Sequence, residues 1–189
     1  MRQIRTMPGA FLLQALPQGG VEAATRLLEA LGAMDASGLT DFGRSMARYG
    51  AHPRLAAILA SAETPRAHAT ASDLCALLEE KDPLRRPSDG GGGRKEVASS
   101  DVAWRLDALH GGSTQLGDRH ILRRIRNLAS RYRAASRVSA KTKIDLDDVG
   151  PLLAAAFPDR LAMAMDGTGR YRLAGGAVRN SRRGALGTA

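Results

Sequence analysis

The chain has 189 residues, of which 43% are hydrophobic and 25% charged, and its 28 lysines and arginines against 19 aspartates and glutamates give a formal net charge of +9. This composition is typical of a globular protein with one or two domains and excludes a disordered chain. No apolar run approaches the roughly 20 residues of a membrane span, the apolar patch before Gln18 is too short for a secretory signal, and a single cysteine, Cys75, excludes an internal disulfide. We therefore expect a cytoplasmic protein without a membrane partner.

The first part of the chain predicts short helices joined by tight connections. Apolar residues at helical spacing predict a helix over residues 21–32, and Thr40 has the residue type of an N-cap for a helix that reaches Tyr49. Pro53 begins a third helix, because proline fits the first helical turn. Three such helices with an extended piece at Leu39 indicate a winged-helix-like unit.

A fourth helix and a loop follow. The helix spans about residues 67–80 and has Leu74, Leu77 and Leu78 on its apolar face. Residues 83–100 contain two prolines, four consecutive glycines and several serines, a composition that predicts a flexible loop.

The second half predicts more helices and then a β-hairpin. The helices are expected after Asp101, from about Asp118 to Arg137, and from Asp147 to Pro158. Residues 161–165 and 171–174 flank a short Gly-containing turn and predict a β-hairpin. Residues 177–189 form a basic tail without periodicity, which we expect to be disordered. The predicted fold class is therefore mainly α, with a winged-helix-like unit, a helical bundle and a short β-hairpin.

The positive charge lies in the second half. Residues 1–101 carry 12 basic and 12 acidic side chains, whereas residues 102–189 carry 16 basic and seven acidic ones. Residues 119–143 contain nine arginines and lysines and no acid, which indicates a surface for a polyanion. Arginine suits this because its planar fork binds phosphate oxygens in pairs. The candidate nucleic-acid-binding residues are Arg119, Arg123, Arg124, Arg126, Arg133, Arg137 and Lys141.

No catalytic or metal-binding constellation is present in the sequence. The Gly90–Gly93 run does not form a phosphate loop, which needs Lys and then Ser or Thr directly after the last glycine. The four histidines lack the spacing of metal ligands, and Cys75 lies among leucines, where we expect it to pack. We expect no catalytic residue, no metal and no cofactor in this chain.

Six runs of residues stand out along the chain: 27–35 (LLEALGAMD), 39–47 (LTDFGRSMA), 52–56 (HPRLA), 73–84 (DLCALLEEKDPL), 155–162 (AAFPDRLA) and 171–174 (YRLA). In this order they resemble the winged helix and the helicase-associated domain of DEAH-box RNA helicases of the HrpB branch.

The resemblance implies an accessory part of a helicase. In such enzymes two motor domains hydrolyse ATP, and the winged helix joins the motor to a helical ratchet domain whose long helix lines the nucleic-acid channel. This sequence has no Walker lysine motif and no D-E-A-H box, so ATP and magnesium would belong to motor domains outside it. The chain, a truncated product in this interpretation, would bind single-stranded RNA or DNA and helicase motor domains.

The pattern of residues and the resemblance together predict the domain organisation. The expected divisions are a poorly matched segment 1–20, a winged-helix-like domain 21–62, a helical ratchet-like domain 63–158 that includes the loop 83–100, a β-hairpin 159–176 and the tail 177–189.

Two alternative functions remain open. In one, the chain is a protein-interaction module that docks onto a helicase motor and turns its basic helix to an acidic partner. In the other, it is a winged-helix DNA-binding regulator that reads bases with Arg44 and Arg48 of the helix after Thr40.

Overall fold

The computed structural model describes residues 18–84, 102–112, 117–166, 169–174 and 176–180. The predicted segment 1–20, except its last three residues, lies outside this range, as do most of the predicted loop 83–100 and the end of the tail.

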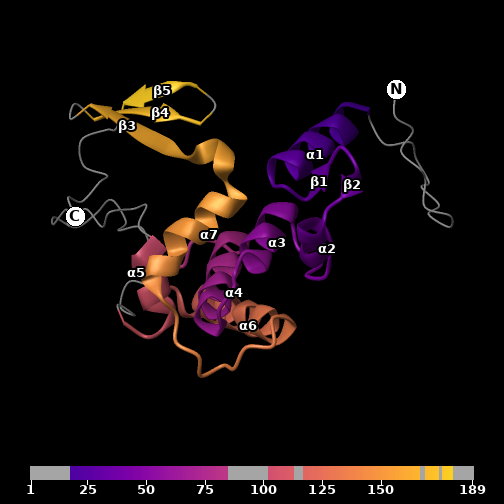
Figure 1. Cartoon of the computed structure of the whole chain (residues 1–189). Helices are drawn as coiled ribbons and strands as arrows, with labels where there is room; N and C mark the ends of the chain where they lie inside the picture. Colours follow the sequence, from indigo (N-terminus) through magenta and orange to yellow (C-terminus); the bar gives the residue numbers. More distant parts are fainter. Residues whose placement is uncertain (1–17, 85–101, 113–116, 167–168, 175, 181–189) are drawn as a thin grey trace.

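The described part of the chain is mainly α-helical, as predicted, with two small antiparallel sheets (Figure 1). The helices are α1 (Gln18–Ala30), α2 (Asp41–Ala47), α3 (Pro53–Ala60), α4 (Pro65–Glu79), α5 (Val102–Leu109), α6 (Arg119–Ala135) and α7 (Val149–Ala156), with short 3-10 turns η2 (Leu146–Asp148) and η3 (Pro158–Arg160). The strands are β1 (Met34–Asp35), β2 (Gly38–Leu39), β3 (Ala162–Asp166), β4 (Arg170–Leu173) and β5 (Val178–Asn180).

The predicted N-cap of α2 is confirmed. The Thr40 hydroxyl accepts a hydrogen bond from the Gly43 amide at 3.0 Å and donates one to the Gly32 carbonyl at 2.7 Å. One side chain therefore fixes both the start of α2 and its position against the end of α1. The two-stranded β1–β2 hairpin lies between these helices. The assignment of this region as a winged-helix domain stays a prediction.

Gly43 is required where α2 crosses the hairpin. A Cβ atom added there would lie 2.1 Å from the Ala33 carbonyl oxygen and 2.7 Å from a Leu39 methyl group. We expect Gly43→Ala to lower the unfolding free energy by about 1–3 kcal/mol. The new methyl group would overlap a backbone carbonyl, which cannot move aside as a flexible side chain could. Chemical denaturation measures the loss. Gly150→Ala in α7 is the matched control, since nothing lies within 4 Å of its added Cβ, and an equal loss in both variants would contradict the steric explanation.

The hydrophobic core is centred on α4. Its residues 69–77 are all buried, and α3, α5, α6 and α7 pack around it (Figure 1). Alanine, serine and threonine make up five of the nine residues 69–77, and small side chains let neighbouring helices approach closely. Leu74 and Leu77 are buried as predicted, but Leu78 is exposed, because it lines an open groove between α4, α5 and α7.

α7 is attached to α3 by an arginine. The Arg54 guanidinium donates to the Ala156 carbonyl and to both carboxylate oxygens of Asp159, at 2.7–3.2 Å, and lies over the Phe157 ring. This contact joins residues about a hundred positions apart in the chain and holds the segment that leads into the C-terminal sheet.

The predicted β-hairpin is confirmed and is extended by one strand. β3 pairs with β4, and β4 pairs with β5, all antiparallel. The prediction that residues 177–189 are disordered is therefore wrong for Val178–Asn180, because the free edge of β4 supplies backbone partners that no local periodicity reveals. Residues 181–189 lie outside the described part of the chain.

Candidate nucleic-acid interface

The basic helix predicted from the sequence is α6. Asp118 caps it by accepting hydrogen bonds from the amides of His120 and Ile121, at 2.9 and 3.3 Å. Its apolar side packs against α4, with Leu122, Ile125, Ala129 and Tyr132 buried. Residues three and four apart share a face of a helix, so this buried stripe leaves the remaining faces of α6 to its arginines.

Three of the predicted arginines share one exposed face of α6. Arg119, Arg123 and Arg126 are spaced by four and three residues, and all are exposed. In the part of the chain that the structure describes, neither Arg119 nor Arg123 has an ion pair or a side-chain hydrogen bond. Arg126 donates from Nε to the Leu109 carbonyl at 2.8 Å, which leaves its terminal nitrogens unused within the described residues. We name these three residues the arginine face.

A different side of α6 carries Arg124. Its guanidinium forms an ion pair with Glu80 at 3.1 Å, at the end of α4. Arg131, seven residues further along, is exposed on the same side and was missed by the sequence analysis, although it lies in the same acid-free stretch. The only signal for Arg131 in the sequence is its position in that stretch. This position does not show whether a residue lies on this side of α6 or on the arginine face.

Arg133 has a structural role in the core. It is only 7% exposed and donates from Nε and Nη2 to the two carboxylate oxygens of Asp73, at 3.1 and 2.9 Å. Its Nη1 also donates to the Thr142 carbonyl at 2.9 Å. Asp73 and the Thr142 carbonyl hold its guanidinium inside the core, so it is not presented to a phosphate on the surface. We leave it out of the proposed interface.

Asp73 is the partner that determines this arrangement. It is 2% exposed and also contacts the His110 Nε2 at 2.7 Å. Burial alone would raise its pKa, but the hydrogen bonds from His110 and Arg133 and their charges lower the pKa below its usual value. Asp73 is therefore an ionised carboxylate between two cationic or donor groups.

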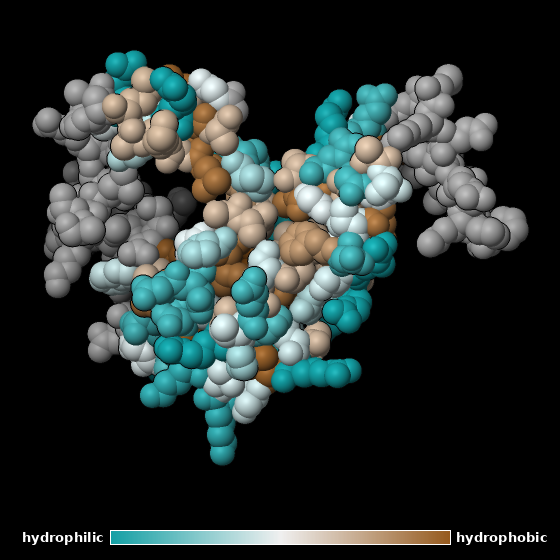
Figure 2. Space-filling view, viewed as in Figure 1, coloured by the Kyte–Doolittle hydropathy of each residue, from teal (hydrophilic) through white to brown (hydrophobic). Residues whose placement is uncertain are grey.

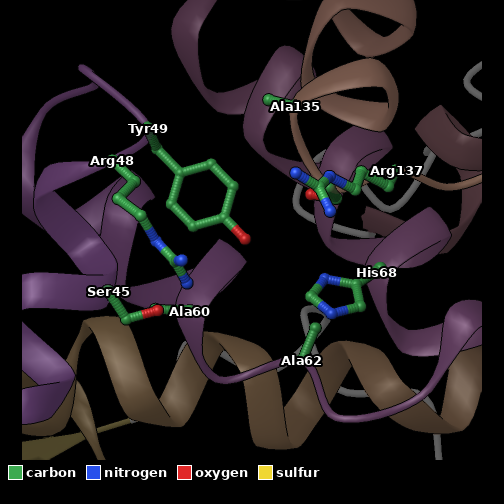
Figure 3. Close-up of a pocket in the computed structure, with 9 residues that line it drawn as sticks. Ser45, Arg48, Tyr49, Ala60, Ala62, His68, Ala135 and Arg137 are labelled. Carbon is green, nitrogen blue, oxygen red and sulfur yellow. The ribbon is translucent and has the colours of Figure 1, made fainter.

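The last two predicted residues lie at and beyond the C-terminal end of α6. Arg137 has a φ of 56°, follows the C-cap residue Ser136, and lines a polar pocket of about 450 Å³ between α2, α3, α4 and α6 (Figure 3). Lys141 is exposed in the segment after the helix. The structure thus does not bring these two residues onto the arginine face.

Arg44 and Arg48, the alternative base-reading residues, make other contacts in the structure. Arg44 donates to the Leu39 carbonyl at 2.8 Å and pairs with Asp41 at 2.6 Å, so it stabilises α2 itself. Arg48 lines the same pocket as Arg137. No observation on α2 favours an arginine that reads a base edge.

Cys75 is a packing residue. It is fully buried, its thiol contacts the Leu55 carbonyl at 3.4 Å, and burial together with the charge of Glu79 raises its pKa. A thiol that stays protonated is a poor nucleophile. Among the described residues, no histidines, cysteines and carboxylates gather in a group able to hold a metal ion, and none of the helices there has the length and apolar character to cross a membrane.

Comparison with known proteins connects this architecture with a bacterial helicase. The chain is 34% identical over 154 residues to the ATP-dependent RNA helicase HrpB of Escherichia coli, a match that covers 82% of this chain and 16% of that protein. No family model matches the chain.

Two solved structures agree with this match. A crystal structure of the E. coli DExH-box NTPase HrpB superposes with a TM-score of 0.59, and one of the E. coli DEAH/RHA helicase HrpB with 0.56, both at 30% identity. They cover 86% and 87% of this chain, but only 17% and 18% of the solved chains. This chain therefore spans less than a fifth of the relatives that it matches.

Proposed function

Because the chain is homologous to one part of an HrpB-type DEAH-box helicase, we propose that it acts as the nucleic-acid-binding accessory region of such a helicase. The ligand is single-stranded RNA or DNA, and the site of action is the cytoplasm. ATP hydrolysis, with its magnesium ion, belongs to motor domains whose Walker and D-E-A-H motifs are absent from this sequence. In this proposal the chain binds the nucleic-acid strand, and the motor domains move the strand by hydrolysing ATP.

The observation that carries the proposal is the arginine face. Arg119 and Arg123 lie on successive turns, about 6 Å apart along the helix axis, without a carboxylate partner in the described residues. Cations without counter-ions attract phosphates, and every phosphate they bind releases condensed counterions. The contacts position a strand without reading its sequence, because phosphates are the same at every nucleotide.

The packing of α6 suits such binding. The helix is held along its length against α4, the most buried helix, and its hydrogen-bonded cap and the Arg133–Asp73 pair fix both ends. A charged face on a rigid helix moves with the domain that carries it. When an attached motor moves this domain, α6 would therefore move the bound strand with it and would not bend.

The first test is binding of a fluorescent single-stranded RNA across a salt series. We expect a dissociation constant in the micromolar range or better at low salt, and a steep linear fall of log affinity with log salt concentration. Single-stranded DNA and duplexes of the same length are the controls for ligand class. No binding at the lowest salt concentration would refute the proposal.

A second candidate function is docking onto the motor domains, and exposed apolar residues favour it. Leu161, just before β3, and Met163 and Val178 in the C-terminal sheet have 45–64% of their surface exposed. Figure 2 shows apolar side chains on this sheet as well as between the helices. A groove of about 360 Å³ beside them is lined by Leu78, Leu153, Phe157 and others. If the salt series shows no RNA binding while HrpB motor domains bind the chain without nucleic acid, docking is the better description.

A further inference from the structure

The polar pocket at the C-terminal end of α6 is a separate feature from the arginine face. Its volume is about 450 Å³, within the range of small-molecule sites. The two ends of α6 lie about 24 Å apart, so the pocket is remote from Arg119. The residues that line it are Ser45, Arg48, Tyr49, Ala60, Ala62, His68, Ala135, Ser136 and Arg137.

Two arginines converge on this pocket without a counter-ion. Figure 3 shows Arg48 and Tyr49 entering from one side and Arg137 and His68 from the other, with their polar ends toward the same space. No carboxylate is among the lining residues. Neither guanidinium has an ion pair or hydrogen bond within the described chain, in contrast to Arg44, Arg54 and Arg133, which all have carboxylate partners.

Two buried polar atoms of the pocket also lack a partner. His68 Nδ1 and Ser136 Oγ are inaccessible to solvent and make no hydrogen bond. Buried polar atoms are almost always paired in folded proteins, because an unpaired one costs about 1–3 kcal/mol. Both can offer a hydrogen to an oxygen atom, Ser136 through its hydroxyl and His68 in the tautomer with hydrogen on Nδ1.

Helix dipoles explain only part of this arrangement. Arg48 and Arg137 follow the C-terminal ends of α2 and α6, where a cation is favourable. That effect accounts for one arginine at each helix end. It does not account for their lining the same cavity, or for the two unpaired polar atoms of residues that line it.

We propose that this pocket binds a phosphate group. The two guanidinium groups would bind its oxygens by charge-assisted hydrogen bonds, and the Ser136 and His68 side chains would turn toward it, bringing their solvent-inaccessible Oγ and Nδ1 atoms into the pocket as neutral donors. The phosphate is carried either by a free ligand of nucleotide size or by a nucleic-acid strand. The site goes beyond the proposed function, because it contains no residue of the arginine face and its occupancy does not depend on that face.

The experiment is an NMR titration of the full chain, with the arginine Nε–H signals as the readout, at constant ionic strength. The first probe is inorganic phosphate, followed by adenosine monophosphate and a short single-stranded RNA without a terminal phosphate. We expect saturable shifts of the Arg48 and Arg137 signals. Arg48→Gln and Arg137→Asn should each weaken phosphate binding about tenfold or more, since each removes charged hydrogen bonds.

The variants are chosen to keep the fold. Asparagine tolerates the positive φ at position 137 better than most residues do, and Arg48 is exposed. Arg44→Gln, on the same helix as Arg48, is the control and should bind phosphate like the parent. Thermal unfolding of every variant shows whether the fold is intact.

The outcomes separate the two sources and can overturn the proposal. If the variants weaken phosphate and adenosine monophosphate but not RNA, the pocket takes a free ligand. If RNA binding weakens as well, the pocket takes a backbone phosphate. Shifts that rise linearly without saturation, or equal affinity in both pocket variants and the parent, would refute a phosphate site even if the arginine face binds RNA.

Discussion

Removing the charge of Asp73 is expected to lower the unfolding free energy by about 3–5 kcal/mol, the cost of leaving a buried charge without its partner. In Asp73→Asn the buried Arg133 guanidinium keeps its charge but loses its negative partner, and asparagine offers it one oxygen acceptor instead of two. Arg133→Met has the converse effect and leaves the carboxylate with His110 as its remaining side-chain partner. Because whole domains are stable by about 5–15 kcal/mol, either variant should unfold at a much lower denaturant concentration.

A double variant and a pH series test the explanation. Asp73→Leu with Arg133→Met removes both charges and should lose less than the sum of the single variants. The lowered pKa of Asp73 means that the unfolded chain binds this proton more readily than the folded one. Its stabilisation is therefore complete above the unfolded pKa and is lost as the pH falls through the folded pKa, and Asp73→Asn should remove that part of the acid sensitivity. Additive losses and an unchanged acid profile would contradict a coupled ion pair.

The same variants separate structural from functional arginines. If Arg133→Met lowers RNA binding only in proportion to the unfolded fraction, the residue acts through the fold. Arg131→Gln, two positions away and exposed, is the control for helix charge and should leave the denaturation midpoint nearly unchanged. A fully folded Arg133→Met that has lost RNA affinity would return Arg133 to the interface.

Neutralising two residues of the arginine face should have the largest effect on binding. We expect Arg119→Gln with Arg123→Gln to weaken single-stranded RNA binding about ten- to a hundredfold at low salt, since two charge-assisted contacts are lost. The slope of log affinity against log salt should become shallower by about 1.4, or about 0.7 for each phosphate contact on a single strand. Arg126 is left intact, because its bond to the Leu109 carbonyl also holds α5 against α6.

The matched control removes the same charge from another side of α6. Arg124→Gln with Arg131→Gln changes the net charge equally, but Arg124 is paired with Glu80 rather than free. We expect a small effect on affinity from this variant. Loss of stability does not explain a weaker Arg119 variant, because a cation in the first turn of a helix is unfavourable and glutamine removes it. Equal losses in both double variants would mean that only net charge matters, and an unchanged affinity in the first would refute the arginine face.

The sequence by itself determined the helices and the location of the charge. The periodic apolar residues of α6, the cap at Thr40 and the proline at the start of α3 act within a few residues of where they stand. Local interactions of this kind depend on residue type and spacing, so they can be read from the sequence. The acid-free stretch over residues 119–143 is likewise visible without any coordinates.

Only the tertiary structure decided what each arginine does. Periodicity assigns Arg133 to the charged side of α6, yet a carboxylate sixty residues earlier meets it in the core. Glu80 pairs with Arg124 for the same reason, and the pocket of Arg48 and Arg137 joins four helices that are separate in the sequence. The third strand, β5, also needs the edge of β4. These outcomes depend on which distant residues the packing of helices brings together, and the spacing along one segment holds no information about that.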